Sequence, residues 1–133
     1  MSVVHGKPDE LIFNVCATNN VFIGNWELVI KTVTLAVCED ISQSTFSLSC
    51  NAVKSFFTHD VSNSSYSQHE TPLAIIGVNA KRGELLTSNV SSFKFRITHP
   101  VEQIKFTLTD VAKKCEVQKN VICTIFFNIY RVS

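Results

Sequence analysis

Alternation of apolar and polar residues dominates the second half of the chain. In Ser92–Thr98, and again in Ile104–Thr109, every second residue is apolar. A period of two is typical of a half-buried strand, because successive side chains leave opposite faces of a sheet. Val121–Val132 follows and is apolar at most positions. The pattern therefore predicts two half-buried strands, followed by a strand that is central in its sheet or lies in an interface.

The chain before residue 80 contains four further strand-like segments. Leu11–Cys16 is a short apolar run, and Trp26–Val37 is rich in the residues that pleated sheets favour. Phe46–Asn51 alternates strictly, and Leu73–Val78 is a fourth apolar run in which Gly77 suggests a bulge. Turn-forming residues separate these segments, and no segment has a helical period. Short strands between regular turns indicate a sandwich or a barrel.

Strict alternation would give Trp26–Val37 two apolar faces, so this strand is predicted to be central or covered on both sides. One face would hold Trp26, Leu28 and Ile30, and the other Val29, Val33, Leu35 and Val37.

These segments predict an all-β fold, a single β-sandwich of seven to eight antiparallel strands over residues 10–133, after a flexible N-terminal tail at 1–9. An immunoglobulin-like sandwich requires a second cysteine two residues after a tyrosine. Cys16 and Trp26 fit the start of that pattern loosely, but neither Cys115 nor Cys123 follows a tyrosine in this way. A jelly roll requires only two facing four-stranded sheets, so it is the preferred type.

Charge and composition narrow the class of partner. The chain has 133 residues, of which 45% are hydrophobic and only 17% charged, and its net charge is +1. A near-neutral chain lacks the concentrated basic face that nucleic acid requires, so no specific nucleic acid is expected. Few charges suit a protein that buries extra surface against partners. With no apolar membrane span and no secretory signal, we expect a cytoplasmic or nuclear location.

The five cysteines are expected to be reduced thiols. Their number is odd, and no CxxC pair with zinc-site spacing occurs. Cys16, Cys50 and Cys123 lie in apolar strand patterns, where cysteine usually acts as a small core hydrophobe. A disulfide remains open, because pairing cannot be read from spacing.

Chemical motifs are scarce. No nucleophile elbow and no phosphate-binding glycine loop occurs, so no enzyme activity and no cofactor are predicted. Thr58–Thr71 is polar and lacks an apolar period, which predicts a surface loop of the kind that often binds ligands. Two histidine–acid neighbours lie in it, but adjacent side chains of an extended chain diverge, so no metal is predicted. The candidate binding residues of this loop are His59, Asp60, Tyr66, His69 and Glu70.

The last predicted strand has two apolar rows. One row contains Val121, Cys123, Ile125, Phe127 and Ile129, and the other contains Ile122, Phe126 and Tyr130. A monomer with a solvated outer face would have one polar row. Either a bulge or loop shifts the phase of the strand, or the second row is an oligomer interface, since exposed apolar patches usually mark one. Ile122, Phe126 and Tyr130 are therefore the candidate interface residues.

Two segments carry a resemblance to a known family. Gly24–Ile30 reads G-N-W-E-L-V-I, and Gln103–Asp110 reads Q-I-K-F-T-L-T-D before a turn and the final apolar strand. Together they resemble small jelly-roll proteins of polinton-like and adintovirus-like DNA elements, which are penton-type or minor capsid components. The likeness covers about a third of the chain. It departs from the family where Val111–Lys114 replaces an expected glycine turn and where Val29–Ile30 replaces a small residue.

The resemblance implies a structural protein that assembles, and with it a location in a virion. The expected function is self-association through β-sandwich surfaces, as a homo-oligomer or with other structural proteins, in a viral or virus-derived capsid. The alternative is a ligand- or receptor-binding sandwich that uses the 58–71 loop.

Overall fold

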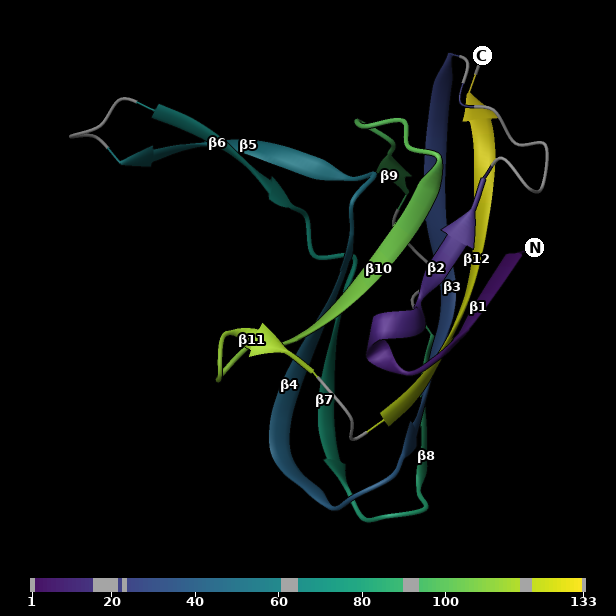
Figure 1. Ribbon diagram of the computed structural model, residues 1–133, viewed down its shortest axis with the longest axis vertical. Helices are drawn as coiled ribbons and strands as arrows, with labels where there is room; N and C mark the ends of the chain where they lie inside the picture. The colour runs from purple at the N-terminus through teal and green to yellow at the C-terminus, as the bar shows by residue number, and fades with distance from the viewer. Residues whose placement is uncertain are drawn as a thin grey trace.

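The computed structural model describes residues 2–15, 22, 24–60, 65–89, 94–117 and 121–132, and for 55–60 and 65–69 it describes the backbone alone. Within these residues the chain is all-β apart from one short 3-10 turn, η1 (Pro8–Glu10). Two antiparallel sheets pack face to face (Figure 1). The expected all-β fold with two packed sheets is therefore confirmed.

The first sheet has the order β1-β12-β3-β8. Its central strands are the two longest of the chain, β12 (Val121–Val132) and β3 (Asn25–Val37). β1 (Ser2–Gly6) forms one edge, and β8 (Leu85–Asn89) with the two-residue β9 (Phe95–Arg96) forms the other. β3 is thus a central strand, as the sequence predicts.

The second sheet has the order β11-β10-β4-β7. β10 (Gln103–Asp110) and β4 (Ile41–Cys50) form its centre, and β7 (Ala74–Ala80) forms one edge. On the other edge, β2 (Ile12–Asn14) and β11 (Cys115–Glu116) pair with opposite ends of β10.

A third ladder joins β5 (Lys54–Asp60) to β6 (Ser65–Glu70). In Figure 1 this hairpin extends away from the two sheets, on the connection between β4 and β7.

Strand pairing in the two sheets is nested. β1 pairs with β12, β2 with β10, β3 with β8 and β4 with β7, and every pair is antiparallel. The long ladders of β12 with β3 and of β10 with β4 join these pairs, and short ladders add β9 to β3 and β11 to β10. The chain changes sheet at each step from β1 to β4.

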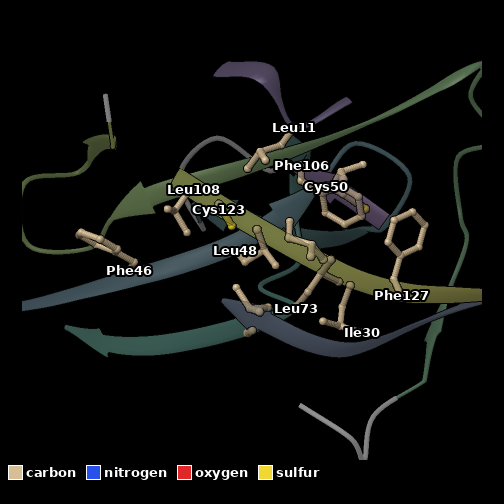
Figure 2. Close-up of a cluster of buried hydrophobic side chains, with 14 of the residues drawn as sticks. Leu11, Ile30, Phe46, Leu48, Cys50, Leu73, Phe106, Leu108, Cys123 and Phe127 are labelled. Atoms are coloured by element: carbon tan, nitrogen blue, oxygen red, sulfur yellow. The ribbon is translucent and has the colours of Figure 1, made fainter. Parts of the chain in front are cut away.

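The core lies between the sheets and follows the period of two. Phe46, Leu48 and Cys50 of β4 are buried, as are Phe106 and Leu108 of β10. From the first sheet, Ile30, Cys123 and Phe127 point into the same space (Figure 2). On β12, four members of the predicted row, Val121, Cys123, Ile125 and Phe127, are buried, and the fifth, Ile129, is half-buried and packs against the core.

A bulge in β3 changes the predicted faces of that strand. Phe126 pairs with Thr32, and Phe127 pairs with Ile30, so Lys31 is an extra residue with no partner. A bulge shifts the phase of alternation by one residue. Leu28 and Ile30 therefore share the core face with Val33, Leu35 and Val37, and the predicted assignment to opposite faces is wrong.

Three other segments differ from expectation. The predicted N-terminal tail contains β1, which pairs with β12 over Ser2–Gly6. Leu85–Asn89, where the sequence predicts no strand, forms β8. Gly77 is not a bulge, because it pairs regularly with Thr45 and the irregularity of this ladder lies between Ile41 and Ser44. Of the predicted strand at 92–98, residues 92 and 93 lie outside the described residues.

Candidate interaction surface

The outer face of the first sheet contains the predicted interface row. Ile122 is half-buried, and Phe126 and Tyr130 expose 37% and 45% of their surface. All three alternate with the buried row of β12, so they lie on the side of the sheet that faces away from the core. The structure therefore places the three candidate residues on one face.

Neighbouring strands extend this face with further apolar side chains. Phe126 lies opposite Val3 of β1, which is 50% exposed. Ile122 lies opposite Ala36, and Ala36 lies opposite Leu85 of β8, which is 68% exposed. Sequence reasoning missed Val3 and Leu85, because each lies in a strand that contains too few apolar residues to show alternation.

Val29 is an apolar residue of the same face that is almost fully buried. It pairs with Asn128 of β12, and its exposed fraction is 4%, although it does not belong to the main core cluster. The Asn128 amide Nδ2 donates a hydrogen bond of 2.9 Å to the hydroxyl of Tyr130. This bond fixes two neighbouring side chains of the surface.

A polar row crosses the sheet between the Ile122 and Phe126 rows. It consists of paired residues from four strands: His5, Thr124, Thr34 and Thr87. Nδ1 of His5 lies 2.6 Å from Oγ1 of Thr124, within hydrogen-bond distance. The surface is therefore a set of apolar rows separated by hydroxyl groups, a mixture that suits an interface which forms between folded subunits.

The outer face of the second sheet is more polar. Hydroxyl residues pair across its centre, Thr107 with Ser49 and Thr109 with Ser47. The large apolar side chains exposed there are Ile12 and Ile75, at 45% and 67%. The two faces of the sandwich therefore differ, and the first sheet presents the larger apolar surface.

The predicted 58–71 loop is instead largely the β5–β6 hairpin, apart from residues 61–64, which lie outside the described residues. The register pairs Thr58 with Tyr66 and Asp60 with Ser65, and His59 lies at the irregularity between Thr58 and Asp60. At the other end of the ladder, Ser55 pairs with His69 and Lys54 with Glu70. The two histidine–acid neighbours therefore lie at opposite ends of the hairpin.

The base of the hairpin is fixed to the sandwich by hydrogen bonds. The Ser49 hydroxyl donates to Oε2 of Glu70 at 3.0 Å. The backbone N–H of Lys54 donates to Oγ1 of Thr98 at 3.0 Å, and the N–H of Thr71 donates to the carbonyl of Val53 at 3.1 Å. A fixed base gives the ribbon a defined direction as it leaves the second sheet.

An open groove of about 800 Å³ lies between the start of β4 and β11. Its acidic side chains are Glu39, Asp40, Asp110 and Glu116. Oδ1 of Asp110 already accepts hydrogen bonds from the backbone N–H groups of Ala112 and Lys113, at 3.1 and 3.2 Å. Within the described part of the chain, no three histidine, cysteine or acidic side chains converge as metal ligands would. No described helix is long and apolar enough to cross a membrane.

The four described cysteines are free thiols, as predicted, and they divide into two kinds. Cys50 and Cys123 are fully buried, and burial raises the pKa of Cys50 to about 11 and the pKa of Cys123 to about 12. Their expected core positions are confirmed. Cys38 and Cys115 are exposed, and Cys16 lies outside the described residues.

Comparison with known proteins found no matching family model, no matching curated protein and no matching solved structure.

Proposed function

We propose that this chain is a non-enzymatic structural protein that self-associates through the outer face of its first sheet, as a capsid component of a virus or a virus-derived element. The observation that carries the proposal is the apolar row of Ile122, Phe126 and Tyr130, which Val3 and Leu85 extend on the neighbouring strands. Large exposed apolar side chains gathered on one face are typical of protein–protein contacts.

The strand order supports a jelly roll as the type of sandwich. In a jelly roll, two facing four-stranded sheets are built from eight strands. Here the nested pairs of β1 with β12, β2 with β10, β3 with β8 and β4 with β7 supply eight strands in that arrangement. Jelly rolls form viral capsid domains, and they also form lectin and cupin domains. The fold is thus compatible with assembly, and the apolar face is what favours it.

The physical case for self-association rests on water exclusion. Phe126 of β12 and Val3 of β1 are paired residues on the outer face of the first sheet, and both are exposed. Covering apolar surface contributes roughly 25 cal/mol per Å², and pairing two copies of one patch across a two-fold axis buries both copies in a single contact. The threonine row between the apolar rows can bond across the contact without placing charge in it.

The test is the mass of the native protein by size-exclusion chromatography with light scattering. Wild type is expected to form a discrete oligomer or particle. Phe126→Asp places an unpaired charge in the desolvated contact and is expected to give a smaller species with unchanged far-UV circular dichroism. Ile12→Asp is the matched control, because Ile12 is about equally exposed but lies on the second sheet.

Two results would contradict the proposal. If Phe126→Asp unfolds the chain, the row is part of the fold rather than a contact. If it changes neither mass nor stability, the patch is bare surface.

A second candidate function is recognition of a ligand or receptor through the β5–β6 hairpin. The observation in its favour is that this ribbon pairs with no strand of either sheet and projects from the sandwich (Figure 1). This candidate predicts a strict monomer. Replacing residues 55–69 by an Asn-Gly turn should then keep the fold and abolish capture of any glycan that the full chain binds on a printed array. Glycan binding that survives the replacement would exclude the hairpin.

A further inference from the structure

β7 is an edge strand, and one side of its backbone has no strand partner among the described residues. Its only strand neighbour among the described residues is β4, so one edge of its backbone faces away from the sheet. It is also the longest edge strand, with seven residues against five in β1 and five in β8. The N–H and C=O groups on such an edge are a template for another strand.

β7 lacks the features that usually protect an edge. Its sequence, A-I-I-G-V-N-A, contains no charged residue and no proline. Its own residues pair with β4 without a shift from Ala74 to Val78, and the irregularity at its end comes from one extra residue in β4. Natural edge strands are commonly blocked by lysine, proline or a bulge. β7 is therefore left able to extend its sheet.

We propose that β7 pairs antiparallel with β7 of a second copy of this chain, about a two-fold axis that passes through Gly77. The contact rests on the proposed self-association but uses a different surface from the Phe126 face. A two-fold axis perpendicular to the sheet keeps the core faces of both copies on the same side of the joined sheet. A core-facing residue of one copy must therefore pair with a core-facing residue of the other, and an outward-facing residue with an outward-facing one. Centring on Gly77, the middle residue of β7, pairs all seven residues.

Three features favour a second copy as the partner. The strand is neutral, so pairing it with itself brings no like charges together, which would be costly for a charged strand. The register sets exposed Ile75 opposite Asn79 of the partner subunit, and buried Ile76 opposite the partner's Val78. Gly77 has no side chain, and a Cβ built there would meet no atom within 4 Å, so no neighbouring side chain overhangs the centre of the contact.

A seven-residue ladder alone is a small contact. Stable interfaces usually bury more than about 1,000 Å² in total. The edge pair is therefore expected in an oligomer whose chains are also joined through the apolar face, because closure of such an assembly makes the last contact intramolecular.

Disulfide trapping tests the register directly. In a parent with Cys38→Ser and Cys115→Ser, the added Gly77→Cys thiol would lie opposite its own copy. Paired Cα atoms of an antiparallel ladder are about 4.5–5.5 Å apart, within the range of a disulfide. Mild oxidation is expected to give a covalent dimer on a non-reducing gel, above the level of the parent.

Asn79→Cys in the same parent is the matched control. Asn79 and Gly77 are both exposed and lie on one face of β7. The two Asn79 positions of the proposed dimer are offset by four residues, roughly 13 Å along the strand, so no cross-link is expected. Absence of the Gly77→Cys dimer, or equal cross-linking of both variants, would overturn the proposal.

Charge exchange at Gly77 gives a second, reversible test. Gly77→Lys or Gly77→Glu alone places like charges opposite each other and is expected to reduce the oligomer, whereas mixing the two variants restores it. The neutral Gly77→Thr should behave as wild type. If the mixture stays as small as each variant alone, the two-fold edge pair is wrong.

The two contacts fail separately. If Phe126→Asp leaves the mass of the oligomer unchanged while the Gly77→Cys cross-link forms, the face contact is contradicted and the edge pair is supported. The reverse pattern would contradict the edge pair and leave the face contact standing.

Discussion

The rings of Phe106 and Phe127 meet between the two sheets, with their centroids 5.2 Å apart. Phe106 belongs to β10 and Phe127 to β12, and both are fully buried. Phe13 of β2 packs edge-on against Phe127 at a centroid distance of 5.1 Å. Three strands from both sheets thus meet in one aromatic cluster, which aligns the sheets by ring geometry as well as by burial.

Truncation of this cluster should be costly. Phe106→Ala removes a fully buried ring and leaves a cavity, so we expect a loss of about 3–5 kcal/mol in the free energy of unfolding. Lys105→Ala is the neighbouring control, because Lys105 is exposed on the other face and only its backbone groups bond to Asn51. It should cost less than about 0.5 kcal/mol. Urea denaturation measures both, and equal losses would contradict the assigned faces.

Native alkylation should separate the thiols by exposure. Iodoacetamide is expected to modify Cys38 and Cys115 in the folded protein, and to modify Cys50 and Cys123 only after denaturation, because the buried thiols are inaccessible and resist ionisation. Mass spectrometry of digested protein locates the modified residues. Early labelling of Cys123 would show that the first sheet opens locally.

The buried thiols should also make stability depend on alkaline pH. Their pKa values in the folded chain, about 11 and about 12, lie above the ordinary value of 9.0, so the folded state favours the neutral thiol. This contribution is fully present below pH 9.0 and is lost as pH rises through the folded values, because the unfolded chain ionises first. Unfolding free energies of wild type should therefore approach those of Cys123→Ala above about pH 9. A difference that does not change with pH would contradict the burial of that thiol.

The turn after β10 offers a stabilising substitution. Lys114 adopts a left-handed conformation with φ of 54°, and its N–H donates to the carbonyl of Asp110 at 2.9 Å. Glycine adopts this conformation without strain. Lys114→Gly is expected to raise the free energy of unfolding by about 0.5–1 kcal/mol, after the larger entropy of glycine in the unfolded chain is subtracted. Lys113→Gly, where φ is not positive, should lower it, and the reverse order in urea denaturation would contradict the turn geometry.

The strands with a strong period of two could be predicted from the sequence. Val121–Val132 has the same bounds as β12, and the alternation around Phe106 correctly identifies the buried side of β10. β1 and β8 could not be predicted in this way. Their backbones are held by pairing with β12 and β3. Each strand has only five residues, and its few apolar residues are not enough to show a period.

Only part of the candidate surface could be predicted from the sequence. The row of Ile122, Phe126 and Tyr130 follows from alternation along one strand. Its extension to Val3 depends on which strands are neighbours and on the register in which they pair. Neither can be predicted from the alternation of residues along one strand. The bulge at Lys31 is equally hidden, because an extra residue in one strand is defined only by its partner.

The nested strand order has a consequence for biosynthesis. β12 lies between β1 and β3, although both are translated more than eighty residues earlier. Until β12 leaves the ribosome, β1 has no partner in the first sheet and the β3 edge that β12 will occupy is unpaired. Sheets that depend on such distant partners form slowly and expose apolar edges meanwhile. The nascent chain should therefore depend on chaperones throughout translation and close its first sheet in one late step.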